Sequence, residues 1–237
     1  MKLSIIVPAF NEEKTIGEML SKLISLNIGS IDKEIIVVND GSTDSTGQII
    51  EKIKKYNQSL IVIDHVKNKG KGAAVRTGFT SATGDILIIQ DADLEYNPND
   101  IPKIIKPIVE KNARVVYGTR LKIKPILFGK NKTPLLLHFF GNKFLSLVTT
   151  ALYGYPISDM ETCYKAFEKN VIKGMRLRSR SFNFEPEITA KILKKGIRIL
   201  EIPIKTKPRG FDEGKKLRTF HDGGIALWTL LKYRFKN

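Results

Sequence analysis

The first half of the chain alternates short β-branched runs with amphipathic stretches of helical period. Short apolar runs between turn residues predict strands, and apolar positions repeating every three to four residues predict helices. The predicted strands are Leu3–Val7, Glu34–Val38, Leu60–Val66, Asp85–Gln90 and Ala113–Tyr117, and the predicted helices are Glu13–Leu26, Ser45–Tyr56, Gly72–Ala82 and Asn99–Lys111. This alternation predicts an α/β fold with a mostly parallel sheet and helices on both faces.

The second half is less regular. Its longest apolar stretch, Leu135–Tyr155, is interrupted by polar residues and glycines, as an interfacial segment would be. The remaining expectations are strands or turns at Thr162–Phe167 and Arg198–Ile204, helices near Glu187–Lys195 and Ile225–Phe235, and basic loops at Lys122–Pro134 and Lys205–Arg218. We therefore expect one domain over residues 1–237, with an irregular second half.

Charge divides the chain more sharply than hydrophobicity does. Residues 1–111 carry a net charge of −1 and residues 112–237 one of +17, which gives +16 in total. A basic half indicates an anionic partner, although a solvated lysine-rich surface has the same composition. The single cysteine agrees with a reducing compartment. No signal peptide or membrane-spanning stretch is apparent, so we expect a cytoplasmic protein.

The most informative motif follows the strand that ends at Gln90. Asp91 and Asp93 are two residues apart, so their carboxylates point to the same side of an extended chain, and Glu95 comes two residues later. Adjacent carboxylates repel each other unless a cation lies between them. Oxygen ligands suit Mg²⁺ or Mn²⁺, which often carry substrate phosphates. The alternative is an acidic turn that holds no ion.

Other polar groups follow strand ends and should share this edge of the sheet. Asp40 ends a strand before Gly41, and it either accepts bonds from a nucleotide or belongs to a helix-capping turn. Lys69 lies in a Gly/Lys loop that could cradle phosphate but lacks the spacing of a P-loop. Arg120, Arg209 and Lys215 could face phosphates, and Asp159, followed by Glu161, could act as a base or orient a substrate.

Five of these motifs occur in order at the spacing typical of family 2 glycosyltransferases. They are residues 5–12, 37–44, 68–72, 91–93 and 118–120. Within that family the chain most resembles the polyprenyl (dolichyl) phosphate mannose and glucose synthases, because of residues 159–167, Pro208, Arg209 and residues 214–217. The resemblance covers essentially the whole chain, and its second-half motifs are the looser ones.

The resemblance implies a GT-A fold, a nucleotide-diphosphate sugar donor and a divalent metal, Mg²⁺ or Mn²⁺. It divides the domain into a nucleotide-sugar-binding half, residues 1–119, and an acceptor and membrane-facing half, residues 120–237. It also assigns roles by position. The nucleoside would contact Pro8, Phe10, Glu12, Val38 and Asp40; Lys69, Asp91 and Ala92 complete the donor site; Asp91, Asp93 and Glu95 would hold the metal; and Asp159, Arg120, Arg209 and Lys215 form the catalytic set.

Two departures from the family pattern stand out. Glu95 occupies a position where relatives often carry Gln, and the sequence ends near residue 237, where many relatives continue into transmembrane helices. The signature Gln-x-x-Arg-Trp of processive polysaccharide synthases is absent, which favours transfer of a single sugar.

These observations predict a metal-dependent inverting glycosyltransferase that moves one hexose, from GDP-mannose or UDP-glucose, to a polyprenyl phosphate. We expect it to be peripheral at the cytoplasmic face of an anionic membrane, or attached to a membrane-anchored subunit. One alternative is a family 2 enzyme with a non-lipid glycan or cell-envelope acceptor. Another is a basic nucleic-acid-binding protein or nucleotidyltransferase. The absence of basic strands interleaved with aromatic residues argues against a nucleic-acid partner.

Overall fold

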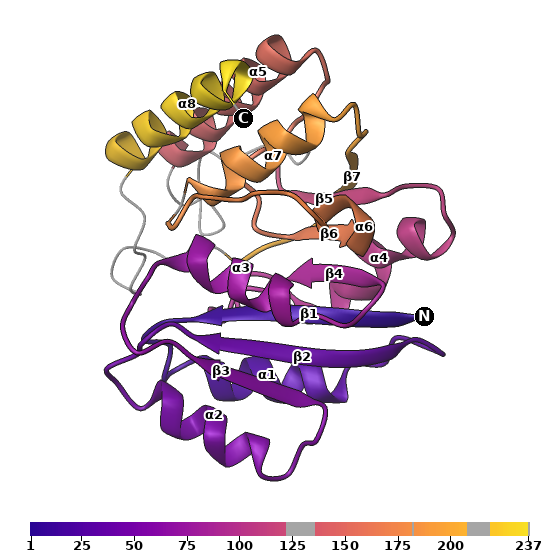
Figure 1. Cartoon of the computed structure of the whole chain (residues 1–237), viewed down its shortest axis with the longest axis vertical. Helices are drawn as coiled ribbons and strands as arrows, with labels where there is room; N and C mark the ends of the chain where they lie inside the picture. The colour runs from indigo at the N-terminus through magenta and orange to yellow at the C-terminus, as the bar shows by residue number, and fades with distance from the viewer. Residues whose placement is uncertain (122–135, 182, 208–218, 237) are drawn as a thin grey trace, which may run out of the picture.

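A computed structural model describes residues 1–121, 136–181, 183–207 and 219–236, although nothing is described of the side chains of residues 136–138, 219 and 220. One seven-stranded sheet, with the order β3-β2-β1-β4-β6-β5-β7, forms the centre of the molecule (Figure 1). Its strands are β1 (Lys2–Ala9), β2 (Asp32–Asn39), β3 (Leu60–Asp64), β4 (Ile86–Ile89), β5 (Val115–Thr119), β6 (Lys165–Glu168) and β7 (Leu200–Pro203).

Six of the strands keep the predicted parallel direction, and β6 is the exception. It pairs antiparallel with both β4 and β5, whereas the other neighbouring pairs are parallel. Each of the seven predicted strands is present within a few residues. Leu60–Val66 was predicted too long, because β3 ends at Asp64 and Val66 is fully exposed.

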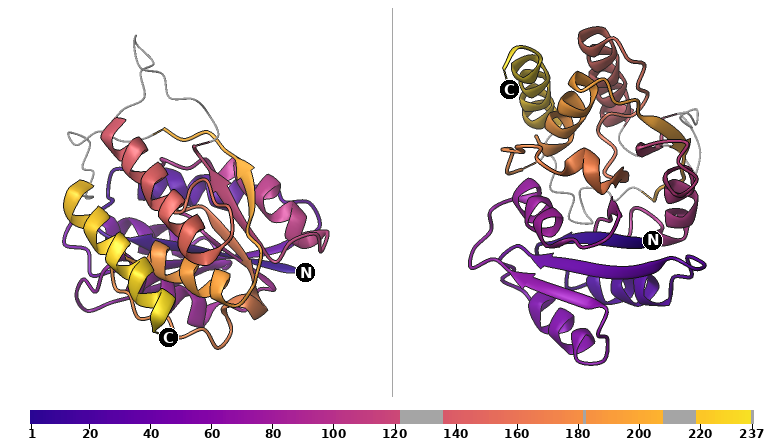
Figure 2. Two further views of the ribbon diagram at one scale, coloured as in Figure 1. Left: turned by 90° about the horizontal axis from the view of Figure 1, so that it is seen from above. Right: turned by 45° about the vertical axis from the view of Figure 1, so that its right-hand side comes forward.

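Helices cover both faces of the sheet (Figure 2). The helices α1 (Ile16–Ser25), α2 (Thr46–Lys54) and α4 (Ile101–Val109) pack on one face, and α3 (Lys71–Ser81) and α7 (Phe184–Lys194) pack on the other. The long helices α5 (Leu136–Tyr153) and α8 (Thr219–Phe235) pack side by side beyond α7. A short α6 (Lys169–Ile172) and a 3₁₀ turn at Pro98–Asp100 complete the described elements.

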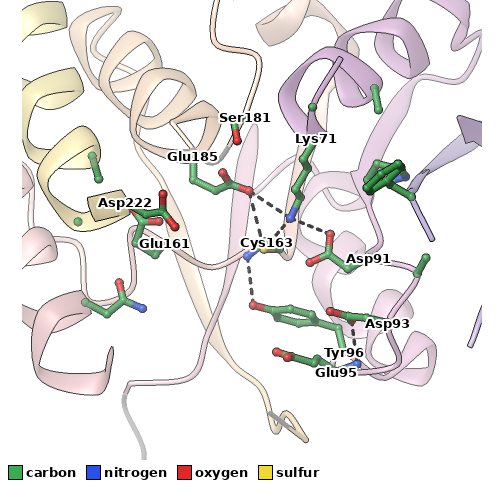
Figure 3. A pocket seen from close by; sticks show the side chains of 18 of the residues that line it. Lys71, Asp91, Asp93, Glu95, Tyr96, Glu161, Cys163, Ser181, Glu185 and Asp222 are labelled. Carbon is green, nitrogen blue, oxygen red and sulfur yellow. Dashed lines mark hydrogen bonds and ion pairs between the residues drawn. The ribbon is translucent and has the colours of Figure 1, made fainter. Parts of the chain in front are cut away.

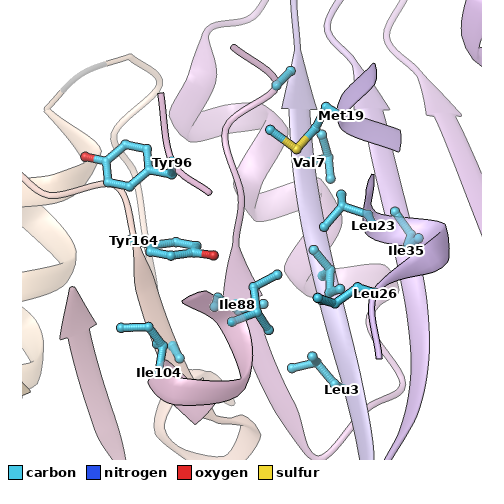
Figure 4. Packing of buried hydrophobic residues seen from close by; sticks show 14 of the residues in the cluster. Leu3, Val7, Met19, Leu23, Leu26, Ile35, Ile88, Tyr96, Ile104 and Tyr164 are labelled. Carbon is cyan, nitrogen blue, oxygen red and sulfur yellow. The ribbon is translucent and has the colours of Figure 1, made fainter. Parts of the chain in front are cut away.

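The alternation of side chains along the strands creates two separate hydrophobic clusters. Along β1, Leu3, Ile5 and Val7 enter the cluster under α1 and α4, while Ile6 enters the cluster under α3. Figure 4 shows the first cluster, in which Ile88 of β4 lies between Ile104 of α4 and Leu3 of β1. Because β1 and β4 are buried on both faces, their sequences are mostly apolar rather than alternating, with Ser4 as a buried polar exception in β1.

Three helix predictions need correction. The Leu135–Tyr155 stretch is not a broken segment, because α5 runs continuously from Leu136 to Tyr153. Helix α8 begins at Thr219, six residues before the predicted start, and α7 begins at Phe184, three residues early. Helix α2 has Ser45 as its N-cap, and the carboxylate of the preceding Asp44 accepts a hydrogen bond from the Thr46 N–H. The predicted loop Lys122–Pro134 lies outside the described residues. The same holds for residues 208–218 of the predicted loop Lys205–Arg218.

Gly78 is required by the close approach of α3 to β1. A Cβ atom there would lie 2.4 Å from Cγ2 of Ile6, a fully buried residue of β1. We expect Gly78→Ala to lower the free energy of unfolding by about 1–3 kcal/mol, because a core without voids cannot take up the methyl group. Urea unfolding measures the change.

Gly223→Ala is the matched control, because no atom lies within 4 Å of its would-be Cβ in helix α8. There the better helix propensity of alanine should raise stability by up to about 1 kcal/mol. Equal destabilisation by the two substitutions would contradict a packing role for Gly78.

Candidate active site

A cavity of about 680 Å³ lies at the carboxyl ends of β1, β2 and β4, where the predicted motifs meet. Contacts between loops confirm the predicted shared edge: Ser42 Oγ accepts a hydrogen bond from the Asn11 N–H at 3.1 Å, and Thr46 Oγ1 accepts one from the Glu12 N–H at 2.8 Å. The predicted site residues that line the cavity are Pro8, Phe10, Glu12, Asp40, Asp91, Ala92, Asp93, Glu95 and Arg120.

Other predicted site residues lie elsewhere. Val38 is fully buried in the hydrophobic cluster under α3, so its side chain does not reach the cavity. Lys69 has an exposed side chain and does not line the cavity. The lysine in the cavity wall is Lys71, two residues later. Lys71 begins α3, whereas Lys69 lies before the helix. Arg209 and Lys215 lie outside the described residues.

Asp40 organises the Gly/Lys loop from within the protein. Its buried carboxylate accepts hydrogen bonds from the backbone N–H groups of Lys69, at 3.0 Å, and Gly70, at 2.8 Å. His65 Nδ1 lies 2.6 Å from Oδ1 of Asp40, and His65 Nε2 lies 2.9 Å from Thr77 Oγ1. His65 therefore has a structural role, because it supports the carboxylate that holds the loop preceding Lys71.

Gly70 allows a second contact to fix this loop. Its φ is +93°, and a Cβ atom there would lie 2.3 Å from the carbonyl oxygen of Arg180. The 178–181 segment that supplies this carbonyl is itself held by Glu187 of α7, which accepts hydrogen bonds from the N–H groups of Arg178 and Ser179. The start of α3 and the start of α7 are thus locked together beside the cavity.

Lys71 is the central cation of the cavity wall (Figure 3). Its ammonium lies 2.8 Å from the Asp91 carboxylate, 3.3 Å from the Glu185 carboxylate and 2.9 Å from Cys163 Sγ. Burial alone would lower the pKa of Lys71, but the attraction of Asp91, Cys163 and Glu185 outweighs it and raises the pKa well above its usual range. Lys71 is therefore a fixed positive charge at neutral pH.

The acidic segment after β4 follows one side of the same cavity. Asp91 faces Lys71, and Asp93 Oδ1 accepts a hydrogen bond from the Glu95 N–H at 3.0 Å (Figure 3). In the described part of the chain, no three His, Cys, Asp or Glu side chains are gathered closely enough to hold a metal ion. The three-ligand set of Asp91, Asp93 and Glu95 thus stays a prediction. Two cavity-facing carboxylates are still a suitable oxygen donor set for a hard divalent ion that also binds phosphate and water.

Arg120 enters the cavity with its direction fixed by Asp159. The two side chains form a bidentate pair with Nε and Nη2 each 2.8 Å from a carboxylate oxygen, and the Arg120 N–H also donates to Asp159 at 2.8 Å. Asn142 of α5 adds a donor at 3.1 Å to the same carboxylate. Asp159 is fully buried and absent from the cavity wall, so in this arrangement it orients Arg120 and does not contact a substrate.

The energetics of this pair follow from its burial. Burial raises the pKa of Asp159, but the Arg120 guanidinium outweighs that effect and holds the pKa below its usual range. Glu201 supports the same turn by accepting hydrogen bonds from the N–H groups of Ser158, at 2.9 Å, and Asp159, at 3.0 Å. Breaking such a buried pair leaves an uncompensated charge inside the protein.

Sequence reasoning missed several residues of the cavity wall. Cys163 contacts Lys71, and its N–H donates to the Tyr96 hydroxyl at 3.2 Å. Glu185 comes from the first turn of α7, which was predicted to start later. An earlier helix start could have been inferred from Glu185 and Glu187 together, because acidic residues favour the first turn of a helix. The missed lining residues include Lys71, Tyr96, Asn142, Phe144, Cys163 and Glu185.

Comparison with known proteins identifies the family. Residues 4–175 match the family described as glycosyl transferase family 2. The chain belongs to this family. It is therefore a glycosyltransferase, and the resemblance found in the five sequence motifs is confirmed.

Two similar sequences come from archaea. A UDP-N-acetylglucosamine–dolichyl-phosphate N-acetylglucosaminyltransferase of Methanococcus voltae is 34% identical over 219 residues, which cover 85% of this chain and 84% of that protein. A dolichol-phosphate mannosyltransferase of Pyrococcus furiosus is 30% identical over 237 residues, which cover 98% of this chain and 64% of that protein.

Solved structures confirm the fold. Glucosyl-3-phosphoglycerate synthase from Mycobacterium tuberculosis, in complex with Mn²⁺, UDP-glucose and phosphoglyceric acid, aligns with a TM-score of 0.74 and 18% identity, covering all of this chain and 80% of that one. The same enzyme with Mn²⁺, UDP and glucosyl-3-phosphoglycerate aligns with a TM-score of 0.73. The mixed sheet with helices on both faces is thus the predicted GT-A fold.

Asp159 should make stability depend on pH. Because its pKa in the folded protein is lower than in the unfolded chain, the pair stabilises fully above the unfolded value near 4, and this contribution is lost as pH falls through the folded value. We expect Asp159→Ala to lower the free energy of unfolding by about 3–5 kcal/mol at pH 7. The difference from wild type should shrink towards pH 3, measured by urea unfolding.

Glu168→Gln is the control for this prediction. Glu168 pairs with Arg114 at 2.8 Å, but both side chains are well exposed, so the change should be below about 1 kcal/mol. A loss for Asp159→Ala that is equally small, or that grows as pH falls, would contradict the buried-pair interpretation.

Proposed function

We propose that this glycosyltransferase moves one hexose, with inversion, from a nucleotide-diphosphate sugar to a polyprenyl phosphate. The observation that carries the proposal is the placement of two kinds of charge in one cavity. Asp91 and Asp93 face it from the end of β4, and Arg120 enters it as a cation fixed by Asp159. Such an arrangement suits a metal-bound diphosphate beside an anionic acceptor. The two archaeal relatives named for dolichyl phosphate support the same acceptor class.

The donor side of the proposal uses the first half of the chain. The nucleoside would lie against Pro8, Phe10, Glu12 and Asp40, which line the end of the cavity formed by β1 and β2. The diphosphate would lie between the β4 segment, with Asp91 and Ala92, and the start of α3. There Lys71, rather than Lys69, supplies the positive charge.

A divalent metal, Mg²⁺ or Mn²⁺, would be held by Asp91 and Asp93, which both line the cavity, and Glu95 stays a predicted third ligand. When bound, the ion offsets the negative charge that develops on the leaving diphosphate. Crystals of the mycobacterial synthase with Mn²⁺ and UDP agree with this class of cofactor.

The acceptor side requires orientation more than proton removal. A phosphate monoester is largely ionised near neutral pH, so its oxygen is already a nucleophile and gains most from positioning and from charge stabilisation. This agrees with an Asp159 that is enclosed by its hydrogen-bond donors and with an Arg120 that reaches the cavity. The role of Asp159 in the proposal is therefore to orient Arg120. Arg209 and Lys215 complete the proposed cationic set.

The paired helices α5 and α8 are the proposed membrane-facing surface. Large apolar side chains are exposed on both: Phe140, Phe144 and Leu147 on α5, and Trp228 and Phe235 on α8. Lys232, Arg234 and Lys236 follow at the end of α8, which suits the headgroup region of an anionic bilayer. Leu230 and Tyr233 of α8 are buried against the core and do not contribute to this surface. Among the described residues, no helix is long and apolar enough to span a bilayer.

Product extraction tests the proposed reaction. The protein is incubated with Mn²⁺, a polyprenyl phosphate and a panel of labelled GDP- and UDP-sugars, and the mixture is partitioned between organic solvent and water. Label in the organic phase, dependent on the acceptor, is the expected result. Label transferred only to an added soluble glycan would favour the non-lipid alternative. Failure to turn over any sugar nucleotide, with tight salt-sensitive binding to DNA, would favour a nucleic-acid function.

Asp93→Ala tests the metal site. Because Asp91 and Asp93 are proposed to share one cation, this substitution should reduce transfer at least about a hundredfold, equivalent to about 2.7 kcal/mol of the barrier, and excess EDTA should have the same effect on wild type. The melting temperature serves as the control for folding. Full wild-type activity in EDTA would exclude a metal-dependent reaction.

Trp228→Ser tests the membrane-facing surface. The indole is 67% exposed, so its replacement should leave stability almost unchanged but weaken binding to vesicles that contain phosphatidylserine by about tenfold. Co-sedimentation at low and high salt measures the binding, which salt should reverse. The control is Tyr56→Ser, which removes an aromatic side chain that is 84% exposed and follows α2, a helix on the opposite side of the molecule from α8 (Figure 1). Wild type that stays in the supernatant at low salt would exclude this surface.

A further inference from the structure

Three arginines project from the segment that leads into α7. Arg176, Arg178 and Arg180 are all exposed, whereas Leu177 packs against the hydrophobic cluster under α3 and Ser179 is buried. This alternation of exposed and buried positions places the three guanidinium groups on the outer side of the segment. We call these three residues the arginine stripe.

Neighbouring carboxylates do not neutralise the arginine stripe. Among the described residues, the arginines that form ion pairs are Arg114 and Arg120, and those of the stripe form none. Glu187 of α7 accepts a hydrogen bond from the Arg178 N–H, but its carboxylate is already paired with the Lys191 ammonium. The guanidinium groups of the stripe can therefore bind an external anion, and their planar shape suits phosphate.

Hydrogen bonds to α3 hold the backbone of the stripe in place. The Leu177 carbonyl accepts a hydrogen bond from Arg76 Nη1 at 3.0 Å, and the Arg180 carbonyl accepts one from the Ala73 N–H at 3.2 Å. Both donors belong to the helix that begins with Lys71. The stripe is thus fixed relative to the cavity wall, so an anion can bind it without first ordering a loop.

The stripe borders the exposed apolar face of α8. Arg178 and Arg180 line a hollow of about 370 Å³ together with Ile225 of α8, whose side chain is 38% exposed. Residues three apart are neighbours on the surface of a helix, so Ile225 shares a face of α8 with Trp228. Asp222 also lines the hollow, but the two arginines outnumber it. Basic and apolar side chains therefore lie next to each other on this surface.

We propose that the arginine stripe binds the phosphate groups of anionic lipids while Ile225 and Trp228 enter the interfacial layer beside it. The inference rests on the proposed membrane-facing surface and gives that surface a defined phosphate-binding part. A lipid surface offers phosphate groups and an apolar layer beneath them, whereas a nucleic acid would leave the apolar face of α8 in water. Basic residues near an anionic bilayer strengthen binding, and salt screens their effect.

Vesicle co-sedimentation tests the proposal. Wild type is compared with the double variant Arg178→Gln/Arg180→Gln on vesicles of phosphatidylcholine with and without phosphatidylserine. The matched control is Lys52→Gln/Lys55→Gln, which removes the same charge from exposed positions at the end of α2, on the opposite side of the molecule from α8 (Figure 1). Thermal melting of each variant monitors folding.

The expected result separates lipid binding from catalysis. The stripe variant should bind the phosphatidylserine vesicles about thirtyfold more weakly, since each basic residue at the surface contributes about fivefold. The control should stay within about twofold of wild type, because charges far from the bilayer are screened. Sugar transfer to a polyprenyl phosphate in the anionic vesicles should fall with binding, whereas transfer to the same acceptor in neutral detergent micelles should be unchanged.

Other outcomes would overturn the inference in distinguishable ways. If the stripe variant binds anionic vesicles as wild type does, the arginines do not contact lipid and the apolar surface of α8 stands alone. If the control loses as much binding, net charge and not the stripe attracts the membrane. If transfer falls equally in micelles, the stripe acts on a substrate instead. If the stripe variant loses binding to single-stranded DNA but not to vesicles, its partner is a nucleic acid. If wild type binds neither kind of vesicle, both the inference and the proposed membrane-facing surface fail, while product extraction still tests the sugar transfer separately.

Discussion

A single buried ammonium joins the parts of the chain that form the cavity. Lys71 begins α3, and its contacts reach Asp91 after β4, Cys163 before β6 and Glu185 at the start of α7. Without that charge, the carboxylates of Asp91 and Glu185 would be left buried without their shared cation, which is unfavourable. The cavity wall therefore depends on one residue whose own position is fixed by its backbone neighbours.

The backbone before Lys71 is held in place by hydrogen bonds and by one close contact with another segment. Asp40 at the end of β2 holds the N–H groups of Lys69 and Gly70, and Gly70 allows the carbonyl of Arg180 to approach α3. The Arg120–Asp159 pair is fixed in the same manner from β5, with Glu201 of β7 behind it. Lys71 and Arg120, the cations that reach the cavity in the described part of the chain, are thus each held by carboxylates, so their positions are set before a ligand binds.

The sequence was sufficient for the fold and for nine of the residues that line the cavity. Strands such as β1 and β4 were predictable because a buried parallel strand needs a continuous apolar run, and Asp91, Asp93 and Arg120 were found because they directly follow such strands. Glu185, in the first turn of α7, and Cys163, before β6, were not found, since they reach the cavity only through tertiary packing. Val38 does not line the cavity, because alternation along β2 turns its side chain to the core beneath α3.

The reversed direction of β6 has a consequence for how the chain completes its sheet. Every residue of β4 is buried, and one of its two neighbours is β6, whose residues lie about eighty positions later in the sequence. Until residues 165–168 have been synthesised and paired, β4 is an unprotected apolar edge, the kind of strand that recruits other chains. β5 reaches the rest of the sheet only through β6. The strands before β6 therefore form no finished sheet by themselves, and the solubility of the first half of the chain during synthesis depends on a strand that the second half provides.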